Sequence, residues 1–191
     1  MIEDFNTYLK TIDSNFWTRL CLDHGTLQLY NKGDEYITIG KVAPHIGLIK
    51  SGSVKYLAYD SEREEKVVGL ETVGGFAASW PFCLNDLPSV VTIQANTNLE
   101  IYSLPTSKIL ELAEQDREME KQIAHSTEQV FYTAYERLIS LYTLSPKERY
   151  EQMLARSPRI FDIFTLKDIA SYLNITPQHL SRLRGIRSSK I

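Results

Sequence analysis

The spacing of apolar positions divides the chain into a helical start, a strand-rich middle and a helical end. Residues 1 to about 22 place apolar side chains on one broad face, which predicts an amphipathic helix. From Leu27 to Leu104, short runs of β-branched and aromatic residues alternate with turn signals, as in an antiparallel barrel or roll. The turn signals are Lys32-Gly33-Asp34, Ser51-Gly52-Ser53, Asp60-Ser61-Glu62, Val73-Gly74-Gly75 and Asn85-Asp86.

Helical periodicity returns after this strand-rich region. It predicts a short helix from Ser107 to about Gln115 and a long helix over residues 116–144. An apolar stripe with nearly heptad spacing runs along the long helix, through Ile123, Val130, Ala134, Leu138 and Leu141. Such a stripe either packs against its own domain or forms the seam of a two-helix dimer. A capping box at Ser145–Glu148 then predicts the start of another helix.

The end of the chain predicts two short helices joined by a tight turn. Thr165 and Asp168 have the spacing of a capping box, so a helix should begin there. Asn174 tolerates the left-handed backbone of a sharp turn. Thr176 is a good cap for the second helix, and Pro177 suits its first position.

The spacing of small, turn-forming and apolar residues in this helix pair is that of a DNA-binding helix-turn-helix. Ala170, Asn174 and Leu180 hold these three positions, and Leu183 should face inward beside Leu180. The side chains predicted to face solvent are Gln178, His179, Ser181, Arg182 and Arg184. The alternative is an ordinary helical hairpin.

The charge distribution supports a separate C-terminal module. From residue 145 onward there are nine Lys and Arg against four Asp and Glu, a net charge of +5. Since the whole chain carries −3, the first 144 residues carry −8. An acidic body with a basic C-terminal module is typical of a sensor attached to a nucleic-acid binder.

Other compositional features exclude several protein classes. Cys21 and Cys83 lie far apart and form no CxxC pair, which argues against a zinc or iron–sulfur site. The N-terminus does not resemble a signal or transit peptide, and no apolar run reaches membrane-spanning length. We therefore expect a cytoplasmic protein without a membrane partner. The four histidines show no metal-ligand spacing, and no catalytic constellation is found, so we expect no metal and no enzyme activity.

This order of parts resembles the Crp/Fnr family of transcription regulators. The resemblance is carried by Gly33-Asp34, by residues 47–55, by residues 74–95 and by the terminal helix pair. It implies an α+β fold: an N-terminal antiparallel β-roll of the cyclic-nucleotide-binding type (a jelly-roll), a long dimerisation helix, and a C-terminal helix-turn-helix lacking a full wing. The implied domains are residues 1–115, 116–144 and 145–191.

The nucleotide pocket implied by the resemblance departs from the family pattern. Members that bind cyclic AMP carry a Gly-Glu pair and, ten residues after the Glu, an Arg that pairs with the phosphate. Here Ala78 and Ser79 replace the pair and Ser89 replaces the Arg, so we expect no cyclic AMP and assign no cofactor. Either the pocket is vestigial or filled by Phe76, Trp80 and Phe82, or it holds a different, neutral effector. The residues of the degenerate pocket are Gly74, Gly75, Phe76, Ala78, Ser79, Ser89 and Val90.

The resemblance also implies double-stranded DNA as a partner, a homodimer formed through residues 116–144, and RNA polymerase as a further candidate partner. The candidate DNA-binding residues are Thr176, Pro177, Gln178, His179, Ser181, Arg182, Arg184 and Arg187. Arg182 suits a guanine edge and Gln178 suits adenine. The competing hypothesis is a β-roll that senses a ligand or binds a protein, with a helix pair that is only structural.

Overall fold

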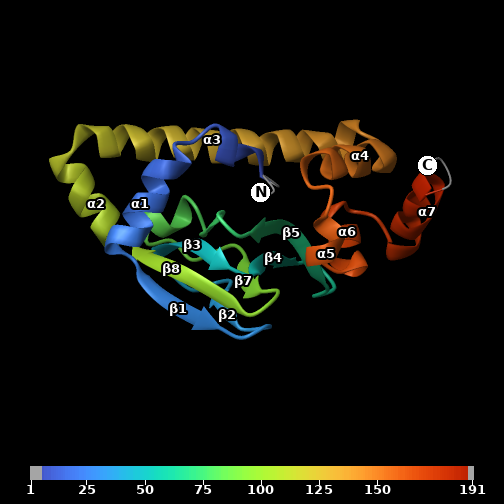
Figure 1. The fold of residues 1–191 in the computed structure, drawn as a ribbon, viewed down its shortest axis with the longest axis horizontal. Helices are drawn as coiled ribbons and strands as arrows, with labels where there is room; N and C mark the ends of the chain where they lie inside the picture. Colours follow the sequence, from blue (N-terminus) through green and yellow to red (C-terminus); the bar gives the residue numbers. More distant parts are fainter. Residues whose placement is uncertain (1–5, 189–191) are drawn as a thin grey trace.

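Two four-stranded antiparallel sheets form the N-terminal body of the protein (Figure 1). The computed structural model describes residues 6–188, except for the side chains of Thr7 and of residues 186–188. One sheet has the order β1-β8-β3-β6 and the other β2-β7-β4-β5. The strands are β1 (Thr26–Tyr30), β2 (Glu35–Ile37), β3 (His45–Ser51), β4 (Ser53–Tyr59), β5 (Glu65–Thr72), β6 (Phe76–Ala77), β7 (Thr92–Ala95) and β8 (Leu99–Pro105). The predicted β-roll is confirmed.

Both sheets contribute side chains to one buried core between them. Ile49 and Ile101 come from the first sheet, and Val54 and Ile93 come from the second. The predicted turns connect the strands, and Gly52 shows why one of them needs glycine. Its φ is +90°, and a Cβ at this position would lie 2.3 Å from the Asn98 carbonyl oxygen.

The N-terminal segment differs from the single helix that its apolar periodicity predicts. It forms a 3₁₀ turn, η1 (Thr7–Lys10), and then a separate helix, α1 (Ser14–His24). The break has a local cause, because the Asp13 carboxylate accepts a hydrogen bond from the Phe16 amide at 2.9 Å. Asp13 thereby caps a new helix instead of continuing the old one.

A long helix lies along one side of the molecule, over the roll, and reaches the C-terminal helices at its end (Figure 1). This helix is α3 (Arg117–Thr143), and the short helix α2 (Thr106–Gln115) precedes it as predicted. A second core joins α1, α2 and α3 to the first sheet through Trp17, Leu104, Ile109 and Met119. The indole N–H of Trp17 donates to the Ser126 hydroxyl of α3 at 2.8 Å.

The C-terminal helices pack against the second sheet rather than forming an independent body. They are α4 (Pro146–Arg156), α5 (Ile160–Ile163), α6 (Leu166–Tyr172) and α7 (Pro177–Ser188). Leu57 and Leu70 of the sheet share one buried core with Met153 of α4 and Ile169 of α6. The predicted capping box at the start of α4 is present, with reciprocal hydrogen bonds between Ser145 and Glu148.

Candidate nucleic-acid interface and effector cavity

Helices α6 and α7 form a capped helix-turn-helix at one end of the molecule (Figure 1). The Thr165 hydroxyl caps α6 by accepting from the Asp168 amide at 3.1 Å. Asn174 has a φ of +53°, which makes the left-handed turn that its side chain favours. The Thr176 hydroxyl accepts from the His179 amide at 3.2 Å, and Leu180 is fully buried beneath α7. These local features agree with the sequence prediction.

The face of α7 directed away from this core is polar and basic. Thr176, Gln178, Ser181 and Arg182 are exposed there. Pro177 and His179 are half-buried, so their contribution to an outer surface is smaller. Gln178 and Arg182 are one helical turn apart and therefore lie on the same side of the helix.

The two remaining arginines among the candidate DNA-binding residues are Arg184 and Arg187 of α7. The guanidinium of Arg184 lies over the Phe161 ring, 4.1 Å from its centroid. This cation–π contact holds the Arg184 side chain against α5, although Arg184 as a whole remains exposed to solvent. Arg187 belongs to α7, but its side chain lies outside the described residues.

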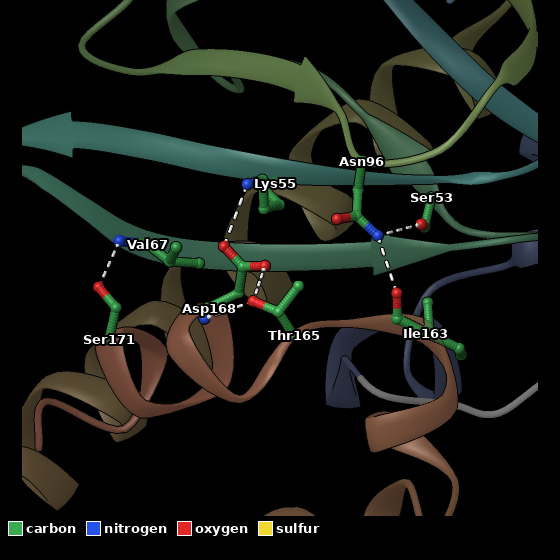
Figure 2. A network of polar contacts seen from close by, with 8 residues as sticks. All are labelled: Ser53, Lys55, Val67, Asn96, Ile163, Thr165, Asp168 and Ser171. Atoms are coloured by element: carbon green, nitrogen blue, oxygen red, sulfur yellow. Dashed lines mark hydrogen bonds and ion pairs between the residues drawn. The ribbon is translucent and has the colours of Figure 1, made fainter. Parts of the chain in front are cut away.

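Helix α6 is held to the roll by a polar network that the sequence did not predict (Figure 2). Lys55 of β4 pairs with Asp168 at 3.0 Å, with side chains only 18% and 12% exposed. The amide of Val67 in β5 donates to the Ser171 hydroxyl at 2.8 Å. The Asn96 side chain donates to the Ile163 carbonyl at 2.9 Å, which holds the end of α5.

This network decides how the helix pair is placed. Asp168 accepts from both Lys55 and the Thr165 hydroxyl, so a residue in the first turn of α6 also anchors the helix to the sheet. Buried charge pairs of this kind are costly to break from one side only. The orientation of α7 is therefore coupled to the second sheet through α6.

A cavity of about 430 Å³ lies between the roll, to which both sheets contribute lining residues, and helices α3 and α4. Four predicted pocket residues line it, namely Phe76, Ala78, Ser79 and Val90, whereas Gly74, Gly75 and Ser89 do not. The Ser89 hydroxyl is instead used within its own loop, where it donates to the Val91 carbonyl at 2.6 Å. The Ser79 hydroxyl is buried without a hydrogen-bond partner among the described residues.

The aromatic residues expected to fill this space lie in its wall. Trp80 and Phe82 line the cavity, and the Trp80 indole donates to the Thr127 hydroxyl of α3 at 3.0 Å. Both side chains thus border the cavity and leave it open, so the expectation that they fill it is not met.

A buried carboxyl group in the cavity wall was not expected from the sequence. Glu71, at the end of β5, is 2% exposed. It accepts hydrogen bonds from Asn6 at 2.7 Å, from the Tyr8 hydroxyl at 2.8 Å and from the Thr72 amide at 3.1 Å. Burial raises the pKa of Glu71 to about 7, although these hydrogen bonds oppose the shift. The sequence signal that could have revealed this buried carboxyl is the acidic residue at position 71, which lies among the apolar residues of β5.

The same contacts fasten the N-terminal segment across the cavity. Asn6 and Tyr8 reach from the chain start to Glu71, and the Asn6 amide also donates to the Leu70 carbonyl at 2.8 Å. A Cβ added to Gly75 would lie 2.2 Å from the Glu71 carboxylate. Gly75 therefore makes room for this carboxyl group.

Three arginines line the opposite end of the cavity, where α3, α4 and α6 meet. Arg137 donates to the Tyr172 carbonyl at 2.8 Å, and its guanidinium lies 3.5 Å from the Tyr172 ring centroid. Arg149 donates to the carbonyl oxygens of Leu173 at 3.2 Å and Leu144 at 2.6 Å. The Nε of the third, Arg156, is buried without a hydrogen-bond partner in the described part of the chain.

The outer face of α3 carries exposed apolar and aromatic side chains. They are Phe131, Tyr132, Tyr135, Leu138, Ile139 and Tyr142. Within the predicted stripe, Val130, Ala134 and Leu141 line the cavity and Ile123 packs against the core of the first sheet. Most of that stripe thus faces the rest of the chain, although Ala134 at the cavity rim is exposed, and Leu138 belongs to the exposed apolar face.

Other candidate chemistry is sparse in the described residues. No group of three or more His, Cys, Asp or Glu side chains in residues 6–188 is arranged to hold a metal ion. Cys21 and Cys83 are buried in the same core, where burial raises the pKa of both thiols. Among the helices that the structure describes, none is both long and apolar enough to cross a membrane.

Known proteins share both a domain and the overall fold with this chain. Residues 27–116 match the cyclic nucleotide-binding domain family. FixK2 from Bradyrhizobium japonicum has a similar structure, with a TM-score of 0.77 and 18% identity, over 87% of this chain and 85% of that protein. The c-di-GMP-responsive global regulator CLP of Xanthomonas campestris is similar over 92% of both chains, with a TM-score of 0.68 and 14% identity.

A third similar structure is a transcriptional regulator of the CRP/FNR family from Thermus thermophilus. Its TM-score is 0.62 and its identity 17%, over 86% of this chain and 87% of that one. None of the proteins with curated annotation matched the sequence. The structural similarity thus extends over 86–92% of the chain in these three cases, well beyond residues 27–116 of the domain match.

Proposed function

Because the chain contains a cyclic-nucleotide-binding-type domain within the fold of Crp/Fnr-family transcriptional regulators, we propose that it is a sequence-specific DNA-binding regulator. The observation that carries the proposal is the outer face of α7. Gln178, Ser181 and Arg182 are exposed on a helix that Leu180 anchors and that Thr176 caps. A recognition helix reads base edges in the major groove with side chains arranged in this way.

In this proposal some side chains on α7 contact base edges and recognise the sequence, whereas others contact phosphates and position the helix. Arg182 pairs with a guanine edge through two hydrogen bonds, and Gln178 pairs with adenine. Thr176, Ser181 and Arg184 contact phosphates and fix the register of the helix. Pro177 and His179 lie in the first turn of α7 and are half-buried, so they offer less surface for contacts with DNA.

The exposed face of α3 supports a homodimer. Six large apolar or aromatic side chains are exposed on α3 between Phe131 and Tyr142, and Tyr142 is 82% exposed. A contiguous apolar patch of this kind marks an interaction surface, and pairing two copies of α3 would bury it. A two-fold dimer then presents two copies of α7, so the operator is a near-palindrome with half-sites roughly 34 Å apart.

Control by cyclic AMP is not part of this proposal. The positions of the two charged anchors hold Ser79, which points no charge into the cavity, and Ser89, which does not line it. A cyclic phosphate would enter beside Glu71 with no arginine at the family position to neutralise it. We expect the protein to bind its operator without cyclic AMP.

The experiment that tests the proposal is selection from a randomised duplex pool with the purified, ligand-free protein. We expect enrichment of one near-palindromic sequence, which Arg182→Ala should lose or broaden at one base pair per half-site. Lys147→Ala is the matched control, since it removes one exposed positive charge of the same C-terminal region away from α7. Absence of any enriched sequence, in buffer and with cell extract added, would favour a β-roll module without productive DNA binding.

A further inference from the structure

We propose that the arginine-lined end of the cavity binds the carboxylate of an elongated, apolar organic acid, whose hydrocarbon body lies along α3. The site is formed by Arg137, Arg149 and Arg156, and the ligand class is a medium- to long-chain aliphatic acid. This inference does not depend on DNA binding, because it rests on the cavity alone.

The three arginines carry positive charge that the ion pairs of the described residues leave unbalanced. None of those ion pairs involves Arg137, Arg149 or Arg156. Glu136 also lines the cavity but forms none of these ion pairs with them. Burial lowers the pKa of Arg137, and the charges of Arg156 and Arg149 act in the same direction. Three cations gathered around one partly buried space favour an anion between them.

Hydrogen-bond donors remain available at the same place. A guanidinium has five N–H donors, and the contacts of Arg137 and Arg149 with backbone carbonyls use only part of this capacity. The Arg156 Nε–H is buried and has no acceptor among the described residues. A buried donor without an acceptor is rare and costly in a folded protein, whereas a bound carboxylate would supply the acceptor.

The remainder of the cavity indicates what the carboxylate is attached to. On α3 the lining runs from Ser126 to Leu141, which corresponds to about 22 Å at 1.5 Å per residue. Trp17 and Trp80 lie in the wall at the Ser126 end, where Trp17 bonds to Ser126 itself. A long and largely apolar space with cations at one end matches an aliphatic acid better than a nucleotide, which needs polar partners along its whole length.

The buried carboxyl of Glu71 does not compete for this role. Its oxygens already accept hydrogen bonds from Asn6, Tyr8 and the Thr72 amide. The arginines are therefore the groups left to hold the charge of the ligand.

Binding at this end would be communicated to the helix pair. Arg137 and Arg149 donate to the carbonyls of Tyr172 and Leu173, at the C-terminal end of α6. A carboxylate bound by the remaining donors of these guanidinium groups would change their position, and with it their hydrogen bonds to the helix end. The ligand would thus alter how firmly α6, and with it α7, is held.

The test uses dodecanoate and the intrinsic fluorescence of the full chain. The protein has two tryptophans, and both line the cavity, so its whole tryptophan emission reports on this space. We expect a saturable emission change with dodecanoate below its micelle concentration, and at least tenfold weaker binding of dodecanol, which lacks the charge.

Two variants make the test specific for the arginine end. Arg156→Gln should weaken dodecanoate binding at least tenfold, because it removes the positive charge and the buried Nε–H donor that has no acceptor among the described residues. Arg159→Gln is the control, since Arg159 is exposed and does not line the cavity, and it should bind as the wild type does. Thermal unfolding of both variants verifies that they are folded. Equal affinity for dodecanoate and dodecanol, unchanged affinity in Arg156→Gln, or no saturable binding would each overturn the proposal.

Discussion

The buried carboxyl group of Glu71 makes the stability of this protein depend on pH in a defined direction. Burial raises the pKa of Glu71 from 4.5 to about 7 in the folded state. Between these values the folded protein binds more protons than the unfolded chain. Its free energy of unfolding therefore falls as the pH rises from about 4.5 to about 7, and then levels off.

The magnitude follows from the shift. One pKa unit corresponds to about 1.4 kcal/mol, so a shift of roughly two and a half units predicts a loss of about 2–3 kcal/mol between pH 5 and pH 8. That loss is a large fraction of the stability of an ordinary domain, which is about 5–15 kcal/mol. Tyr8 does not contribute, because burial and Glu71 raise its pKa well above this range.

The assay is urea unfolding of the wild type and of Glu71→Gln at pH 5, 6, 7 and 8. Taking the difference between the two proteins at each pH cancels the contribution of every other titrating group that the substitution leaves unchanged. The wild type should lose about 2–3 kcal/mol relative to Glu71→Gln across this range. A difference that is constant with pH, or that grows in favour of the wild type at high pH, would refute the buried-acid reasoning.

Three further perturbations test other parts of the structure. Leu180→Ala should cost about 2–5 kcal/mol in urea unfolding, because it leaves a cavity under α7 at a fully buried position; a cost below 1 kcal/mol would contradict this packing. Lys55→Met leaves Asp168 without its ion-pair partner, so we expect faster amide hydrogen exchange in α6 while the first sheet is unchanged; equal exchange would show that the pair does not hold α6. Tyr142→Ser removes the most exposed aromatic side chain on the outer face of α3, so the proposed dimer should dissociate at higher protein concentration, as measured by light scattering after size exclusion; an unchanged dimer would place the interface elsewhere.

The parts of the fold that local chemistry determines could be predicted from the sequence. The capping box at Ser145 and the N-cap at Thr165 mark the starts of α4 and α6, and Gly52 and Asn174 occupy the positive-φ turns expected of them. Each of these signals lies within a few residues of the feature that it specifies. The helix break at Asp13 is also a local feature, since Asp13 caps the helix that begins at the next residue. It was not predicted because the apolar periodicity continues on both sides of Asp13 and indicated a single helix.

The features that escaped prediction depend on residues far apart in the chain. Lys55 and Asp168 are separated by 113 positions, and neither residue alone indicates that α6 docks on the second sheet. The same holds for Asn6 and Glu71, which are 65 positions apart. The arginine cluster at the end of the cavity likewise forms only because α4 folds back beside α3 (Figure 1).

The measurement that tests the proposed function most directly is a competition titration of the purified protein with two duplexes at one fixed salt concentration. One carries the near-palindrome recovered by selection, and the other carries the same bases in scrambled order. A sequence-specific regulator should bind the first at least about 10³ times more tightly, as specific DNA-binding proteins do. Equal affinity for both duplexes would contradict a reading role for α7 and leave only non-specific attraction between its basic face and DNA.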